Sequence, residues 1–184
     1  MLKGLSHTYI PQVYDFVQED GIVYTVMEYI DGESLDHILA RGQTPPQAQM
    51  IQWACQLLEA LVYLHSRPPH GILHADIKPA NIMLRPNGDI CLIDYNIALA
   101  LGEDGAVKVG YSSGYASPEH YGSDGGIGST ISEHQGKKLD ARSDIYSLGA
   151  TLYHLISGVR PALKAEEVVP LPEEICSRAV SAII

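Results

Sequence analysis

The residues of this 184-residue chain that are best suited to chemistry lie near its middle. Asp76, Lys78 and Asn81 share the polar stretch His74–Asn81, and Asp94 follows after two short apolar runs. A carboxylate, an ammonium group and an amide so spaced can converge on one phosphate. A second carboxylate, brought back by a hairpin, would complete an oxygen-ligand site for Mg²⁺. Asp and Asn are also common turn formers, so these four residues alone leave both interpretations open.

The elements around this stretch must bring its polar side chains together. Ile82–Leu84 and Ile90–Ile93 are apolar runs on either side of Pro86-Asn87-Gly88-Asp89, and Asn-Gly is a strong hairpin signal. We therefore predict a hairpin that carries the chain from Asn81 back to Asp94.

Upstream, the pattern predicts a second hairpin and two helices. Gln12–Phe16 and Ile22–Tyr29 are apolar runs joined by a polar turn that ends in Gly21. Ser34 is expected to cap a short helix, Leu35–Ala40. Thr44-Pro45-Pro46, with Thr at the cap, is expected to open a longer helix that ends near Ser66. Its predicted buried stripe consists of Ile51, Ala54, Cys55, Leu58, Leu61, Val62 and His65.

Downstream, the Gly- and Ser-rich segment Ser123–Gly136 indicates a long loop. Asp144–Ser157 is predicted as an apolar helix that stops at Gly158, and Pro172–Ile184 as a further helix. The order of strands, helices, hairpin, loop and helices indicates an α+β domain.

Composition narrows the classes of partner. Hydrophobic residues make up 46% and charged residues 18%, which is typical of a globular domain. The net charge of −10 argues against nucleic acid or an anionic membrane as the main partner. Three separated cysteines and no long apolar run predict reduced thiols and a cytoplasmic protein. A membrane anchor outside these residues stays open.

Five motifs in the same order resemble the catalytic domain of bacterial serine/threonine protein kinases. His74–Asn81 reads HxDxKPxN and resembles the catalytic loop, and Asp94-Tyr95-Asn96 resembles the magnesium-binding loop. Gly114–Glu119 resembles the end of the activation segment, and Ser143–Gly149 the start of the buried central helix. Val26-Met27-Glu28-Tyr29-Ile30-Asp31-Gly32 is similar to the last strand and hinge of the first lobe.

This resemblance implies a protein-kinase-like α+β fold, mainly the helical second lobe with the last strands and hinge of the first. Residues 1–30 would be the remainder of the first lobe, and residues 31–184 a second lobe that is incomplete at its C-terminal end.

The resemblance also assigns roles at the site, with ATP and Mg²⁺ as cofactors. Asp76 would accept the proton of the substrate hydroxyl or orient that hydroxyl. Lys78 would neutralise the transferred phosphate, and Ser112 would tie the substrate-binding loop to both residues. Asn81 and Asp94 would hold magnesium. The adenine would lie between the residues Met27, Glu28, Ile30 and Met83. His74 and Tyr95 would pack in the interior, and Asp144 would anchor the backbone of the catalytic loop.

The expected activity is transfer of the ATP γ-phosphate to Ser or Thr hydroxyls of a protein substrate. The alternatives are a pseudokinase or nucleotide-binding scaffold and, less favoured, a small-molecule phosphotransferase. The family's glycine-rich loop, strand lysine and helix glutamate have no counterparts in these residues, so we expect this chain by itself to be inactive or nearly so.

Two single residues also depart from the family pattern, and the strands at the hinge bear on self-association. Ala75 stands where Arg is usual, which disfavours control by activation-loop phosphorylation, and Asn96 stands where Gly is usual. The strands at the hinge are expected to leave an open edge and an apolar face, which favours a homodimer.

Overall fold

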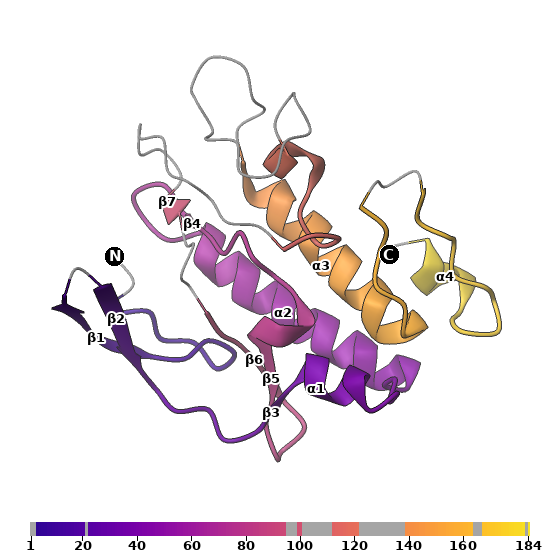
Figure 1. Ribbon diagram of the computed structural model, residues 1–184, viewed down its shortest axis with the longest axis horizontal. Coiled ribbons are helices and arrows are strands. Elements are labelled where there is room, and N and C mark those ends of the chain that lie inside the picture. The colour runs from indigo at the N-terminus through magenta and orange to yellow at the C-terminus, as the bar shows by residue number, and fades with distance from the viewer. Residues whose placement is uncertain are drawn as a thin grey trace.

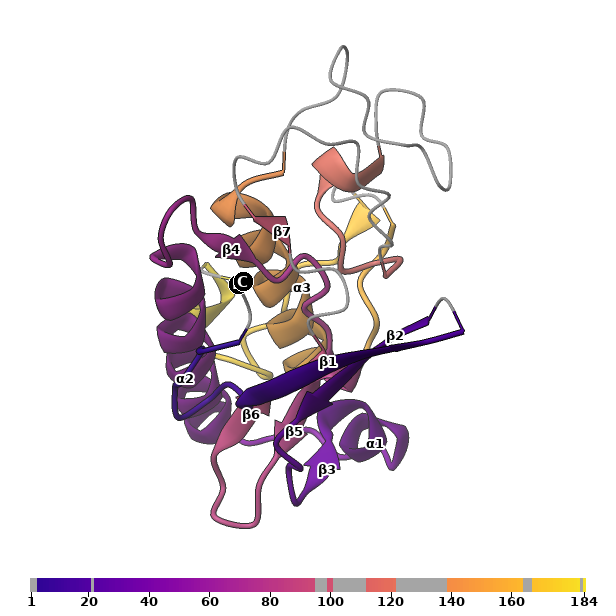
Figure 2. The same ribbon diagram turned by 90° about the vertical axis from the view of Figure 1, so that its left-hand side faces the viewer.

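The computed structural model describes residues 3–20, 22–94, 99–100, 112–121, 139–163, 167–182 and 184. The helices α2 (Gln47–His65) and α3 (Ala141–Ser157) run side by side through the molecule, and the small sheets lie around them (Figures 1 and 2). The fold is α+β, as predicted. The predictions for Tyr95, Asn96 and Ser123–Gly136 concern residues outside the described ranges.

The N-terminal hairpin is confirmed, with a tighter turn than predicted. Strands β1 (Val13–Glu19) and β2 (Ile22–Met27) pair antiparallel, and Glu19 lies opposite Ile22. Asp20 has φ 49°, a left-handed conformation that Asp tolerates better than most residues. Because the connection is this short, β1 includes Gln18 and Glu19, which we predicted to be part of the turn.

The second hairpin is also confirmed and belongs to a three-stranded sheet. Strands β5 (Ile82–Leu84) and β6 (Ile90–Leu92) pair antiparallel, and β3 (Glu33–Ser34) pairs with β5 on its other side. Trp53 of α2 donates from Nε1 to the Gly88 carbonyl at 3.1 Å, and Gln56 binds Asp89 and Ile90. These bonds fasten the hairpin to α2 and so set the position of the chain on either side of it.

The predicted buried stripe of α2 is wrong for most of its members. The buried residues are Met50, Trp53, Gln56, Leu57, Ala60, Leu61 and Leu64. Ile51, Leu58 and Val62 are instead exposed, Val62 by 68%. Apolar residues occur on both faces of α2, so periodicity could not tell which face packs. The helix begins at Gln47 with Pro46 at its cap, not Thr44.

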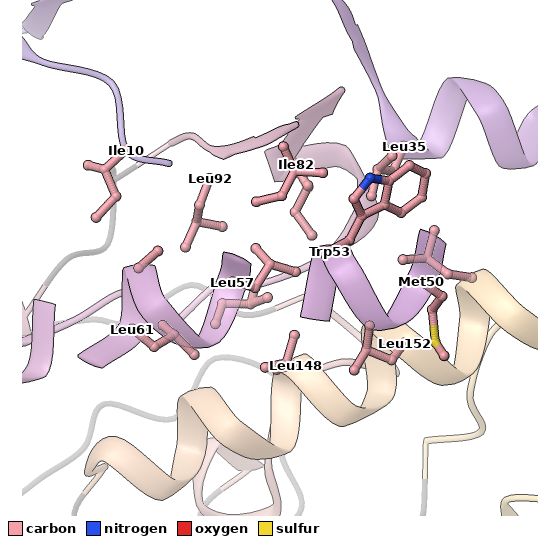
Figure 3. Close-up of a cluster of buried hydrophobic side chains, with 14 of the residues drawn as sticks. Ile10, Leu35, Met50, Trp53, Leu57, Leu61, Ile82, Leu92, Leu148 and Leu152 are labelled. Atoms are coloured by element: carbon pink, nitrogen blue, oxygen red, sulfur yellow. The ribbon is translucent and has the colours of Figure 1, made fainter. Parts of the chain in front are cut away.

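The core forms because α2 is covered on two sides. In Figure 3 its side chains meet Leu148 and Leu152 of α3 on one side and Ile82 and Leu92 of the hairpin on the other. Leu64, Ile82 and Leu92 are all fully buried. This packing holds the two ends of the site on one rigid scaffold.

The ends of α3 follow from local sequence. Asp140 caps the helix with Ser143 in a capping box, and the helix begins at Ala141, three residues before the predicted start. Gly158 ends it with φ 70°, as predicted. The prediction of one helix over Pro172–Ile184 is wrong, because the helix there, α4, covers only Arg178–Ser181.

The remaining elements are short. The helix α1 spans Leu35–Ala40 with Ser34 at its cap, as predicted. The strands β4 (Ile72–Leu73) and β7 (Leu99–Ala100) pair antiparallel, and the one-turn helices η1 and η2 span Pro79–Asn81 and Pro118–Tyr121. No helix in the described ranges has both the length and the apolar composition that crossing a bilayer requires.

Candidate active site

Asp76 and Lys78 form an ion pair in the loop between β4 and η1. The Lys78 Nζ lies 2.6 Å from Asp76 Oδ2, and the Asp76 side chain is only 9% exposed. Oδ1 of Asp76 is buried and finds no hydrogen-bond partner among the described residues. A buried carboxylate with one paired and one open oxygen can accept a proton from a hydroxyl group placed beside it.

Lys78 also reaches the predicted substrate-binding loop. Its Nζ donates to Ser112 Oγ at 2.7 Å, across 34 positions of sequence. The three residues predicted as catalytic therefore form one chain of contacts, Asp76–Lys78–Ser112. A hydroxyl approaching Asp76 from the side of Ser112 would meet the ammonium group as well.

Asn81 is held against Asp76 and is bonded through its backbone to Ile93, the residue before Asp94. Its Nδ2 donates to the Asp76 carbonyl at 2.8 Å and to Asp76 Oδ2 at 3.1 Å. Its own carbonyl accepts from the backbone N–H of Ile93 at 2.8 Å, which places Asp94 next along the chain. The hairpin thus performs the predicted return from Asn81 to Asp94.

The donor set at Asn81 and Asp94 fits a hard divalent cation. The two bonds of Asn81 use its amide nitrogen, so they leave its side-chain oxygen for a ligand, and Asp94 adds a carboxylate. The described residues contain no cluster of three or more His, Cys, Asp or Glu that could hold a metal ion. Mg²⁺ commonly takes one or two carboxylates and completes its shell with phosphate oxygens and water. The pair therefore suits a Mg²⁺–nucleotide complex.

The catalytic loop is fixed by a buried carboxylate of α3. Asp144 is fully buried, its Oδ2 accepts from the His74 N–H at 3.0 Å, and its Oδ1 accepts from the Ala75 N–H at 2.8 Å. Ala75 has φ 62°, which is unfavourable for a residue with a Cβ. The two bonds offset this strain, as the predicted anchoring role of Asp144 requires.

His65 completes this anchor, and sequence reasoning missed it. Its Nε2 lies 2.8 Å from Asp144 Oδ2, although the two residues are 79 positions apart. Nothing in the sequence distinguished this histidine from its apolar neighbours on α2. His65 is the last residue of α2, and the chain continues from there to β4.

His74 is a packed histidine with a defined tautomer. Burial lowers its pKa, so the imidazole is neutral at pH 7. Its Nε2 lies 3.1 Å from the Ile93 carbonyl, which can only accept, so this nitrogen carries the proton. His74 thus joins the catalytic loop to the strand end before Asp94.

The predicted adenine-binding residues lie at the end of β2 and on β5. Met27 and Glu28 are half-buried, Ile30 is buried, and Met83 on β5 pairs with Ser34. The Ile30 backbone makes no hydrogen bond within the described ranges, which leaves it open to a ligand. Arg85, which sequence reasoning missed, reaches Glu28 Oε1 at 3.5 Å and ties β5 to the hinge.

A cavity of about 350 Å³ opens beside this hinge. Glu28, Tyr29 and Ile30 line it together with Asp31, Arg85, Pro86 and Asn87. None of Asp76, Lys78 or Asn81 lines it. The structure therefore brings Asp76, Lys78, Asn81 and Ser112 together in one place and the predicted hinge residues in another, linked by β5.

The comparisons with known proteins agree with these features. The family model for the protein kinase domain matches residues 1–178. The chain is 36% identical over 176 residues to the probable serine/threonine-protein kinase SCO3848 of Streptomyces coelicolor, covering 90% of this chain and 24% of that protein. It is 36% identical over 171 residues to the serine/threonine-protein kinase PknB of Mycolicibacterium smegmatis, covering 86% and 24%. It is 32% identical over 169 residues to pkn3 of Myxococcus xanthus, covering 85% and 28%. The chain spans about a quarter of the length of these relatives.

Proposed function

Because the chain belongs to the protein kinase family, we propose that the protein transfers the γ-phosphate of ATP to serine or threonine hydroxyls of other proteins. The observation that carries the proposal is the contact chain from Asp76 through Lys78 to Ser112. Phosphoryl transfer needs little covalent help from a protein. It depends on positioning of the hydroxyl and on neutralisation of charge, and these three side chains supply both.

In this proposal each residue of the chain acts on a particular atom. Asp76 orients the substrate hydroxyl and takes its proton on Oδ1, which has no hydrogen-bond partner among the described residues. Lys78 stabilises the negative charge on the phosphoryl oxygens and, through Ser112, keeps the substrate-binding loop in register with Asp76. Asp144 holds the backbone on which Asp76 is carried.

The cofactor sites follow from the same geometry. Asn81 and Asp94 are the proposed holders of Mg²⁺, which supplies charge neutralisation at the phosphates when bound. The Glu28 and Ile30 backbone would hydrogen-bond the adenine, with Met27 behind it and Met83 beneath it. In the proposed division, residues 1–30 belong to the first lobe and residues 31–184 to the second. In support, β1 and β2 form a sheet separate from β3–β5–β6.

The direct test uses the full-length protein, because these 184 residues alone are expected to be nearly inactive. It compares the wild type with Asp76→Asn, which keeps the size of the side chain and removes its basicity. Radiolabelled phosphate transfer to a mixed-sequence Ser/Thr peptide pool should fall roughly 10²- to 10⁴-fold, the usual contribution of a general base. Asp15→Asn is the matched control, since Asp15 lies exposed on the N-terminal hairpin, where its carboxylate forms an ion pair only with the exposed Lys3 among the described residues. Equal transfer by wild type and Asp76→Asn would remove Asp76 from the mechanism.

Nucleotide binding distinguishes the proposal from its alternative. Fluorescent ATP should bind wild type and Asp76→Asn alike in Mg²⁺, and Asp94→Asn should weaken that binding. Binding without transfer in the full-length wild-type protein would identify a nucleotide-binding scaffold instead.

A further inference from the structure

The loop that follows Ser112 is clamped to the turn after α3. Arg160 donates from a guanidinium nitrogen to the Ser113 carbonyl at 2.5 Å. Gly114 has φ 86°, and a Cβ there would lie 2.8 Å from the Pro161 carbonyl oxygen. Arg160 itself packs against the same glycine, with Nε 3.4 Å from that Cβ position. The loop and the turn are therefore in direct contact at Gly114.

Tyr115 extends this contact to α3. Its hydroxyl lies 2.6 Å from Nδ1 of His154, and the Arg160 guanidinium carbon lies 5.2 Å from its ring centroid. Burial and the nearby Arg160 both lower the pKa of His154, so this imidazole is neutral at pH 7. The positive charge at this place is therefore that of Arg160.

Arg160 differs from most arginines of the chain in its contacts with acidic side chains. Four others lie within 4 Å of one: Arg41, Arg85, Arg142 and Arg178. Among the described residues no acidic side chain lies within that distance of Arg160, although the protein has a net charge of −10. Arg67 also lacks one, but its guanidinium covers the Tyr63 ring at 4.0 Å.

Asp36 of α1 acts on the same tyrosine as Arg160. Burial raises the pKa of Tyr115, Arg160 lowers it, and Asp36 raises it by less than Arg160 lowers it. Oδ1 of Asp36 already accepts from Ser34 Oγ at 2.5 Å. The exposed guanidinium keeps donors that the Ser113 carbonyl does not use.

Two contacts relate Arg160 to Asp76 and Lys78, where the substrate hydroxyl is proposed to bind. Ser112 contacts Lys78, and the next residue, Ser113, contacts Arg160. An extended chain advances about 3.3 Å per residue, so a bound peptide with its hydroxyl at Asp76 passes Arg160 within a few residues. We propose that Arg160, seated on Ser113 and Tyr115, forms a subsite for an anionic side chain of the protein substrate, a carboxylate or a phosphate. This inference rests on the proposed kinase function.

The test uses alanine-based peptides with one acceptor serine and a single Asp, phosphoserine, Ala or Lys at each of three positions on either side of it. The wild-type protein should prefer Asp or phosphoserine over Ala by about fivefold in kcat/KM at one position, as expected for an exposed ion pair. Phosphoserine peptides show whether phosphate or carboxylate is favoured. The preference should shrink in high salt, because exposed charges are screened.

Variants separate recognition from simple clamping of the loop. Arg160→Gln should bring the acidic-to-neutral ratio close to one, and Arg160→Lys should keep part of it. Arg67→Gln is the matched control and should leave the ratio unchanged. A loss shared equally by all peptides would show that Arg160 only holds the loop, and a preference for Lys peptides would overturn the inference.

Peptide binding decides the inference independently of turnover. Fluorescence anisotropy with the same labelled peptides should show the same preference for anionic peptides and its loss in Arg160→Gln. Selective binding without transfer would count against the proposed function and leave the subsite standing. Transfer without any preference for acidic peptides would contradict the proposed subsite and leave the proposed kinase function standing.

Discussion

The fully buried carboxylate of Asp144 accepts a hydrogen bond of 2.8 Å from the backbone N–H of Ala75, a residue held at φ 62°. One oxygen of a helix residue thus stabilises a strained backbone conformation immediately before the proposed catalytic Asp76. The same carboxylate serves His74 and His65, so one side chain sets the geometry of the whole loop.

Asp144→Asn should destabilise the fold by about 2–4 kcal/mol. The substitution replaces one of the two accepting carboxylate oxygens by an NH₂ group, so a buried backbone N–H of the loop then faces a donor and loses its hydrogen bond. Urea unfolding followed by circular dichroism measures the change. Asp15→Asn, on the exposed hairpin, should shift stability by less than about 0.5 kcal/mol. A shift for Asp144→Asn as small as that of the control would contradict the anchoring role.

Substitutions at Ala75 should depend on the backbone and not on side-chain size alone. Ala75→Gly should be neutral or slightly stabilising, because glycine adopts a positive φ without strain. Ala75→Val should cost about 2 kcal/mol or more, since a β-branched residue is strained at this φ and the site is buried. The two free energies of unfolding, compared in the same buffer, test this order, and a reversed order would refute it.

Acidification should weaken the fold just below neutral pH. Burial lowers the pKa of four imidazoles, those of His7, His74, His120 and His154. The unfolded chain then binds more protons than the native one once the pH falls below the unfolded pKa of about 6.5. Stability is therefore complete above that value and declines as the pH falls toward the native pKa values.

Urea midpoints at pH 7.5 and 5.5 measure this decline. His74→Gln should make the dependence shallower, by at most about 1.4 kcal/mol per pH unit. His70→Gln, at an exposed position, should leave it unchanged. Equal stability at the two pH values would show that these imidazoles charge without cost.

The N-terminal hairpin should mediate self-association. Tyr14, Val17, Ile22, Tyr24 and Val26 are 42% to 55% exposed. Strand β2 has no charged residue, whereas β1 has a bulge near Val13 and carries Asp15 and Glu19. Charges and bulges protect sheet edges, so the edge of β2 is the unprotected one.

Sedimentation velocity over a range of concentrations should show a monomer–dimer equilibrium. Val26→Lys should shift it to monomer, because a lysine on the edge strand opposes pairing. Val62→Lys, an exposed valine of α2, is the matched control and should leave the dimer intact. A wild-type protein that stays monomeric at the highest soluble concentration would contradict the prediction.

Local sequence determined the parts of this protein that depend on neighbours along the chain. Asn87-Gly88 specified the hairpin between Asn81 and Asp94, and Gly158 the end of α3. Turns and caps are governed by backbone preferences that neighbouring residues set. The order of the motifs indicated the family for the same reason, since it needs no contacts.

Only the tertiary structure decided which surfaces and side chains meet at a distance. The buried face of α2 depended on where α3 and the hairpin pack, because both faces of that helix carry apolar residues. The contacts of His65 with Asp144 and of Arg160 with Ser113 join positions 79 and 47 residues apart. Such pairs form because the packed core fixes the elements that carry them, and no local pattern encodes where those elements finally lie.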